Sequence, residues 1–187
     1  MILIKVKAFG GANMDILKLI GCVLIISAST TAGFLYSDSF RKRVNQLNEL
    51  QRCLHQLQNE ILYTYTPLTE SFFNVSSKSK YPIKYIFENA SDSLITNKAN
   101  NVYEAIRTAI DTNINDFDIK KEDIEILLDL SKSLGESDIE GQKSVFNLTI
   151  DNFKKQINEA DEVMKKNVKL FRYLGFTIGA MLVILIV

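Results

Sequence analysis

The sequence predicts an all-α membrane hairpin, in which two transmembrane helices flank a cytoplasmic helical bundle and the last helix is long and continuous into the membrane. Two apolar segments, one near each end, indicate the spans, because a bilayer crossing needs roughly 20 mostly apolar residues. Pro and Gly are sparse, 2 and 8 among 187 residues, which favours long helices over a many-turned β fold. Helical periodicity between the two segments predicts the bundle.

The predicted organisation has four parts. Residues 1–13 precede the first transmembrane helix at 16–37, where no charge lies between Lys18 and Asp38. The cytoplasmic domain covers 38–169, and the second transmembrane helix covers 170–187, with Arg172 placed to reach the headgroups. A lipoprotein or cleaved signal at the first segment is the disfavoured alternative, because the apolar run follows Cys22 and continues past the small residues of any cleavage site.

Basic flanks predict the orientation. Arg41, Lys42 and Arg43 follow the first span, and a second basic cluster, Lys165, Lys166 and Lys169, precedes the other. The positive-inside rule therefore places 38–169 in the cytoplasm and both termini outside a cell membrane. Neither Cys22 nor Cys53 is expected to form a disulfide there.

Residues 1–13 are interpreted as a mis-annotated extension. Codons for Phe9–Met14 can contain GGAGGT shortly upstream of Met14, the layout of a bacterial ribosome-binding site. A real extracytoplasmic tail is the alternative, and N-terminal mass spectrometry decides between translation starts at Met1 and Met14.

The middle of the chain predicts a series of helices. An apolar stripe from Val44 to Ile61 indicates a helix leaving the membrane, and Thr66-Pro67 is expected to end it. Gly135 is expected to end a later helix and a capping box at Ser137–Glu140 to start the last one. Between them we expect helices at 67–75, after Pro82, around 102–110 and at 119–134.

No catalytic, cofactor-binding or metal-binding residue is predicted, so no enzyme is expected. His55 is the only His, and no metal-ligand set, triad or phosphate loop accompanies it. Segment 38–169 holds 18 basic and 21 acidic side chains, a net charge of −3, which disfavours nucleic acid. The acidic residues of the fourth helix are interpreted as surface charges, with a partner-docking face as the alternative: Glu122, Asp123, Glu125 and Asp129.

Gly175 and Gly179 form a GxxxG in the second predicted span. Small residues four apart let another helix backbone approach closely, so helix packing within the hairpin or between copies is favoured over a lipid-facing role.

Three motifs in a fixed order carry a family resemblance. They are EILYTYTPLTE at 60–70, LGESDIEGQ at 134–142 and LFRYLG at 170–175, after an LKLIG opening at 17–21. With these motifs residues 14–187 resemble the stage III sporulation protein AB family of endospore-forming Firmicutes. The departures are the 13 extra N-terminal residues and Phe171 in place of an expected Tyr.

The resemblance implies a component of the channel or secretion-like complex between mother cell and forespore, made during engulfment in the mother cell membrane that faces the forespore. The cytoplasmic domain is similar to the F-type inner-membrane platform of type II secretion and type IV pilus systems. The implied partners are the sporulation ATPase, stage III sporulation protein AA, and the other stage III A-operon membrane proteins. The expected function is a non-enzymatic platform that couples this ATPase to the membrane assembly; a coiled-coil scaffold or signalling adaptor without a motor is the main alternative, and a small transport subunit is a third.

Two segments are the candidate partner-contact or positioning elements under this interpretation. Turn and cap chemistry is an equally weighted alternative for both. The residues are Tyr63, Pro67 and Glu70 at the first bend, and Gly135, Glu136, Ser137, Asp138 and Glu140 at the second.

Overall fold

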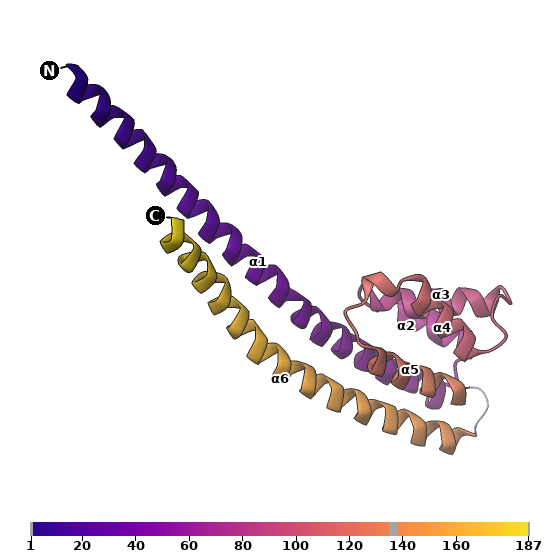
Figure 1. Ribbon diagram of the computed structural model, residues 1–187. Coiled ribbons are helices and arrows are strands. Elements are labelled where there is room, and N and C mark those ends of the chain that lie inside the picture. Colours follow the sequence, from indigo (N-terminus) through magenta and orange to yellow (C-terminus); the bar gives the residue numbers. More distant parts are fainter. Residues whose placement is uncertain (1, 135–137, 187) are drawn as a thin grey trace. The chain divides into compact units, whose positions relative to one another are not determined.

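The computed structural model describes residues 2–134 and 138–186, and every regular element in these ranges is a helix, which confirms the all-α prediction. Figure 1 shows the order of the elements along the chain. They are α1 (Ile2–Leu62), α2 (Leu68–Ser77), α3 (Ile83–Ile95), α4 (Val102–Thr112), the short 3-10 helix η1 (Ile114–Asp116), α5 (Lys121–Ser133) and α6 (Ile139–Ile186).

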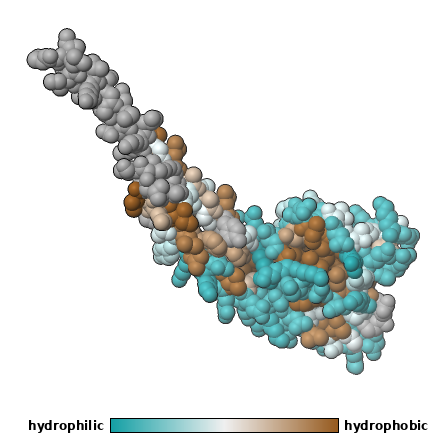
Figure 2. Space-filling model, in the orientation of Figure 1, coloured by the Kyte–Doolittle hydropathy of each residue, from teal (hydrophilic) through white to brown (hydrophobic). Residues whose placement is uncertain are grey.

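The chain divides into two compact units. Unit 1 combines Met1–Phe40 with Val163–Val187, and unit 2 is Arg41–Glu162. The described side chains of unit 1 are largely hydrophobic, whereas the surface of unit 2 is mainly hydrophilic with patches of apolar side chains (Figure 2).

Unit 1 carries the apolar parts of α1 and α6. Among the described residues, one helix is long and apolar enough to cross a bilayer, Ile20–Leu62, and its most apolar 18 residues have a mean hydropathy of 1.6 with none of them buried. The backbone of the second predicted span is helical to Ile186, but many of its side chains lie outside the described part. The Phe40 and Phe171 rings stack, with centroids 6.2 Å apart.

Unit 2 is built on the part of α1 from Arg41 onwards, as the sequence stripe predicts. Leu47, Leu50, Leu54 and Leu57 are all buried, because an apolar side chain recurs every three or four positions on one helix face. Gln51 and Gln58 of this segment donate hydrogen bonds to α6, to the Ile150 carbonyl (3.5 Å) and to Asn147 Oδ1 (3.0 Å) respectively, so the two helices run antiparallel here. α2 packs on α3, α3 on α4, and α4 on α5.

α1 ends four residues earlier than the sequence predicts. Its last residue is Leu62, not Thr66, because Tyr65 adopts a left-handed conformation with φ 55°. The Thr66 N–H then donates to the Glu60 carbonyl at 2.9 Å, which satisfies a carbonyl of the last turn. Pro67 follows as the N-cap of α2, so the turn precedes the proline.

α6 begins at Ile139, with Asp138 as its N-cap. The Asp138 Oδ1 accepts a hydrogen bond from the Gly141 N–H at 2.9 Å, the geometry of a side-chain cap. Ser137, the cap predicted from the sequence, lies outside the described residues, as does Gly135, the predicted end of α5. Asp138 therefore caps α6 within the described residues, and the capping role of Ser137 stays a prediction.

Candidate functional site

A row of polar side chains runs along α1 beside its apolar stripe. We call it the polar stripe of α1. Apart from the adjacent Arg52 and Cys53, its members recur every three or four residues, so they lie on one side of the helix. They are Arg43, Gln46, Glu49, Arg52, Cys53, Gln56 and Glu60, and they bond to the segments that contain or connect the other helices of unit 2.

Arg43, the first member of the polar stripe, connects α1 to α5 and α6. Its guanidinium meets the Asp123 carboxylate of α5 in three contacts of 3.0–3.1 Å and reaches Gln156 Oε1 of α6 at 3.3 Å. The Arg43 side chain is 11% exposed and that of Asp123 is 0% exposed. A planar guanidinium on a carboxylate fixes orientation as well as distance, so this contact sets the register of α1 against α5.

The burial of Asp123 corrects its interpretation as a surface charge. Its Oδ2 also accepts a hydrogen bond from the Lys120 N–H at 2.8 Å, so one carboxylate caps α5 and pairs with Arg43. Its neighbours Glu122 and Glu125 are exposed, as the sequence predicts. Arg43 forms this pair, and its place in a basic membrane flank stays a prediction.

Gln46 fastens the segment that leads into α5. Its Nε2 donates to Asp118 Oδ2 at 3.3 Å, and its Oε1 accepts the Asp118 N–H at 2.8 Å. The side chain is buried, with both amide groups satisfied. The pair holds the chain after η1 against α1.

Glu49 anchors the loop between α2 and α3. Its Oε1 accepts from Arg52 at 2.6 Å and from the Lys80 N–H at 2.8 Å. The Arg52 hydrogen bond, with the Lys80 N–H in support, lowers the pKa of Glu49 despite the opposing effect of burial. Arg52 also donates to the Lys78 carbonyl at 2.9 Å, so both residues hold one loop.

Cys53 lies against the same loop. Its Sγ is 3.0 Å from Ser79 Oγ, and the side chain is fully buried. Burial raises the pKa of this thiol to about 11, although the Ser79 hydrogen bond opposes the shift. Since thiolate is the reactive form, Cys53 has the character of a packing residue.

The first candidate contact segment lies at the far end of the polar stripe. Glu60 Oε2 accepts hydrogen bonds from Thr66 Oγ1 at 3.0 Å and Asn74 Nδ2 at 3.3 Å, which fixes the bend between α1 and α2. Tyr63, Pro67 and Glu70 all lie exposed around this bend. They remain available to a partner, and their predicted role stays a prediction.

The second candidate segment is described only in part. Gly135, Glu136 and Ser137 lie outside the described residues, while Asp138 and Glu140 are exposed at the start of α6. Among described residues no hydrogen bond or ion pair joins these two to the bend at 63–70. The backbone of Gly175 and Gly179 is helical within α6, but their surroundings also lie outside the described part, so the helix-packing role stays a prediction.

No cofactor or metal chemistry emerges from the described residues. They contain no group of three or more His, Cys, Asp or Glu side chains placed to hold a metal ion. His55 is exposed on α1. The polar stripe is a set of positioning contacts, and its signal in the sequence is only a polar row beside an apolar one.

Comparisons with known proteins agree with the fold. The family model of stage III sporulation protein AB matches residues 18–187. A protein of that name from Bacillus subtilis (strain 168) is 28% identical over 173 residues, which span 91% of this chain and 99% of the relative. A solved structure of stage III sporulation protein AB has a TM-score of 0.62 at 22% identity, covering 66% of this chain and 97% of its own. The chain therefore belongs to the stage III sporulation protein AB family.

Proposed function

We propose that this chain is a non-enzymatic membrane platform of the sporulation complex between mother cell and forespore. It couples a cytosolic ATPase, stage III sporulation protein AA, to the other stage III A-operon membrane proteins. Family membership supports a part in sporulation. The F-type platform likeness, the two spans, the cytoplasmic position of 38–169 and the outward termini belong to the proposal.

The arrangement of Arg43, Asp123 and Gln156 is the observation that carries this proposal. A coupler must transmit a displacement without deforming, and apolar packing alone permits sliding between helices. The Arg43 guanidinium bonds to α5 and α6 at once, inside a largely buried site. Directional bonds across three helices resist sliding, so a load on α5 reaches both long helices.

Membrane attachment is supported by the exposed apolar part of α1. None of its most apolar 18 residues is buried in the protein, and an apolar surface of that length is unfavourable in water. A reporter enzyme that is active only outside the cytoplasm, fused after Val187, is expected to be active. If the same reporter enzyme is active only when inserted in the 97–100 loop, the orientation is the opposite of the proposed one.

The platform role is tested in a spore-forming host with the tagged full-length chain. We expect the ATPase to co-purify with the chain from membranes, and a deletion to abolish heat-resistant spores. Asp123→Ala is expected to reduce spores at matched protein abundance, with Asp92→Ala, an exposed acid on α3, as the control. Normal sporulation of the deletion strain refutes the proposal.

A scaffold without a motor is the second candidate. The antiparallel bonds between α1 and α6, from Gln51 to the Ile150 carbonyl and from Gln58 to Asn147, favour it because they are typical of a two-helix rod. A chain that is needed for sporulation but retains no ATPase in membrane co-purification supports the scaffold over the platform.

A further inference from the structure

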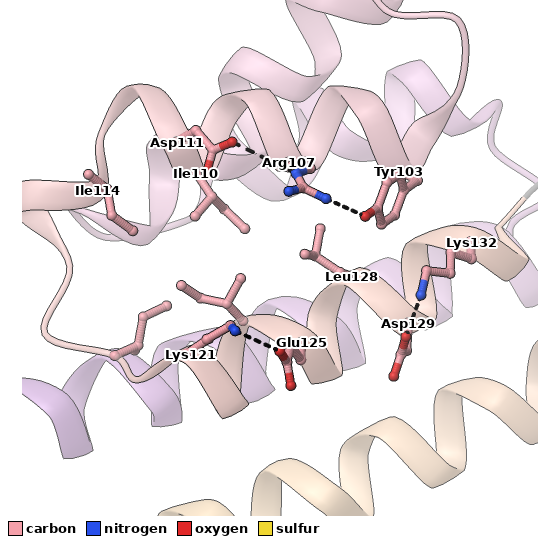
Figure 3. A pocket seen from close by; sticks show the side chains of 12 residues that line it. Tyr103, Arg107, Ile110, Asp111, Ile114, Lys121, Glu125, Leu128, Asp129 and Lys132 are labelled. Carbon is pink, nitrogen blue, oxygen red and sulfur yellow. Dashed lines mark hydrogen bonds and ion pairs between the residues drawn. The ribbon is translucent and has the colours of Figure 1, made fainter.

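A groove of about 680 Å³ lies between α4 and α5, away from the polar stripe of α1. Its floor is aliphatic: Ile110 and Leu128 point into the space between the two helices, with Ile114 at one end (Figure 3). Ile114 is 45% exposed, and Ile119, Ile124 and Leu128 are half-buried. This leaves a row of aliphatic side chains in partial contact with water, which is typical of an unoccupied binding surface.

The rim of the groove on α5 is charged in a symmetric order. It reads Lys121, Glu125, Asp129 and Lys132: base, acid, acid, base. Lys121 pairs with Glu125 at 3.7 Å and Lys132 with Asp129 at 2.8 Å, both exposed. Exposed pairs of this kind contribute little to stability, so they exchange for a partner's charges at little cost.

The rim of the groove on α4 is aromatic and charged. The Lys132 Nζ of α5 lies 5.5 Å from the centre of the Tyr103 ring of α4. The Arg107 Nη1 donates to Tyr103 Oη at 2.7 Å along the same rim. Arg107 also pairs with Asp111 at 3.9 Å, so the cation and the anion of this rim neutralise each other.

A second copy of this chain does not fit this groove through its own α5. A two-fold axis through the centre of the α5 rim would place Glu125 against Asp129 of the second copy and Lys121 against Lys132. Like charges directly opposed across an interface are unfavourable. The charge order therefore selects against α5 pairing with itself.

We propose that the α4–α5 groove binds an amphipathic helix of another protein. That helix carries an aliphatic stripe for the isoleucine floor and two central basic residues, which face Glu125 and Asp129, with acidic residues towards both ends. A helix that lies in an apolar groove contacts it through apolar side chains three and four positions apart, and the row of aliphatic side chains in this groove suits such contacts. This surface is separate from the contacts that carry the platform role, so either one stands if the other fails.

Two designed peptides test the charge order. Both are about 18 residues long, since shorter helices are marginal in water, and both carry the same leucine stripe. One has a central Lys pair with Glu towards both ends, and the other has the reverse. Fluorescence anisotropy with the full-length protein in detergent micelles is expected to show the Lys-centred peptide binding about tenfold more tightly.

A charge-reversal variant makes the test specific to the groove. Glu125→Lys with Asp129→Lys is expected to invert the preference between the two peptides. The matched control, Glu122→Lys with Asp151→Lys, reverses two exposed acids outside the groove and is expected to leave the preference unchanged. Three results each overturn the proposal: no binding of either peptide, equal binding of both, or a preference that survives Glu125→Lys with Asp129→Lys. Dimerisation that Leu128→Glu abolishes also overturns it, since a second copy would then be the occupant.

Discussion

The buried ion pair between Arg43 and Asp123 gives the sharpest test of how unit 2 is held together. Asp123→Ala leaves the Arg43 guanidinium, 11% exposed, with Gln156 Oε1 at 3.3 Å as its remaining hydrogen-bond acceptor. It also removes the acceptor of the Lys120 N–H. Arg43→Met leaves the opposite charge, the Asp123 carboxylate, fully buried with that N–H as its remaining donor.

The expected magnitude follows from burial. Removing one partner of a buried pair typically costs 3–5 kcal/mol of unfolding free energy, because the other charge is left uncompensated. Arg43 retains some water and one acceptor, so Asp123→Ala is expected near the lower end, about 3 kcal/mol. Arg43→Met is expected at about 4 kcal/mol, since Asp123 has no exposed surface. The double variant Arg43→Met with Asp123→Ala is expected to lose much less than the sum of the two single losses, because no charge stays buried.

Chemical unfolding of the full-length chain in detergent, followed by circular dichroism, measures these differences. Glu122→Gln on the exposed side of α5 is the control, expected within about 0.5 kcal/mol of the parent. Losses below about 1 kcal/mol for both single variants, or strictly additive losses in the double variant, would refute the buried-pair reasoning.

Three further changes probe single residues of unit 2. Burial raises the pKa of Cys53 from 9.0 to about 11, so the thiol of the unfolded chain ionises at a lower pH than the thiol of the folded chain. The stability advantage of the parent over Cys53→Ala is therefore expected to shrink from pH 9 to pH 11. A constant advantage would contradict the burial of this thiol. The pKa of Glu49 is lowered in the folded chain, so its carboxylate stabilises the fold above the ordinary value of 4.5. The stability advantage of the parent over Glu49→Gln is expected to fall as the pH drops below about 4.5. An advantage that grows there would show that the fold does not hold the carboxylate as the anion. Tyr65→Gly is expected to raise the unfolding free energy by about 0.5–1 kcal/mol, since Gly adopts φ 55° without strain. A loss of stability in the same unfolding assay would mean that the Tyr65 ring packs on the protein.

The helices could be predicted because their signals are local. The steps of three and four between Leu47, Leu50, Leu54 and Leu57 fix one buried face of α1, and these residues are buried as predicted. The prolines at 67 and 82 stand directly before α2 and α3. The end of α1 was missed, because the left-handed turn at Tyr65 uses a residue that rarely adopts that conformation and leaves no glycine to reveal it.

The polar stripe of α1 could not be found in the same way. A polar residue beside an apolar stripe is normally solvated, and the sequence does not say which chain segment, 70 or 80 residues away, approaches it. Gln46 and Arg43 meet Asp118 and Asp123 through contacts of this long range. The candidate contacts at Tyr63 and Glu70 follow from motifs; both residues are exposed, and their contact role stays a prediction.

Two residues of the polar stripe hold the loop between α2 and α3 through its backbone. Arg52 donates to the carbonyl of Lys78, and Glu49 accepts from the N–H of Lys80, so neither bond depends on the lysine side chain. Lys78→Ala is therefore expected to change the unfolding free energy by less than about 0.5 kcal/mol. Arg52→Ala is expected to cost about 1–2 kcal/mol, because the buried Glu49 loses its counter-charge and the Lys78 carbonyl loses a donor. Equal losses for Lys78→Ala and Arg52→Ala in the same unfolding assay would show that side-chain contacts hold this loop. A larger loss for Arg52→Ala means that α1 holds this part of the loop through its backbone and not through the Lys78 side chain.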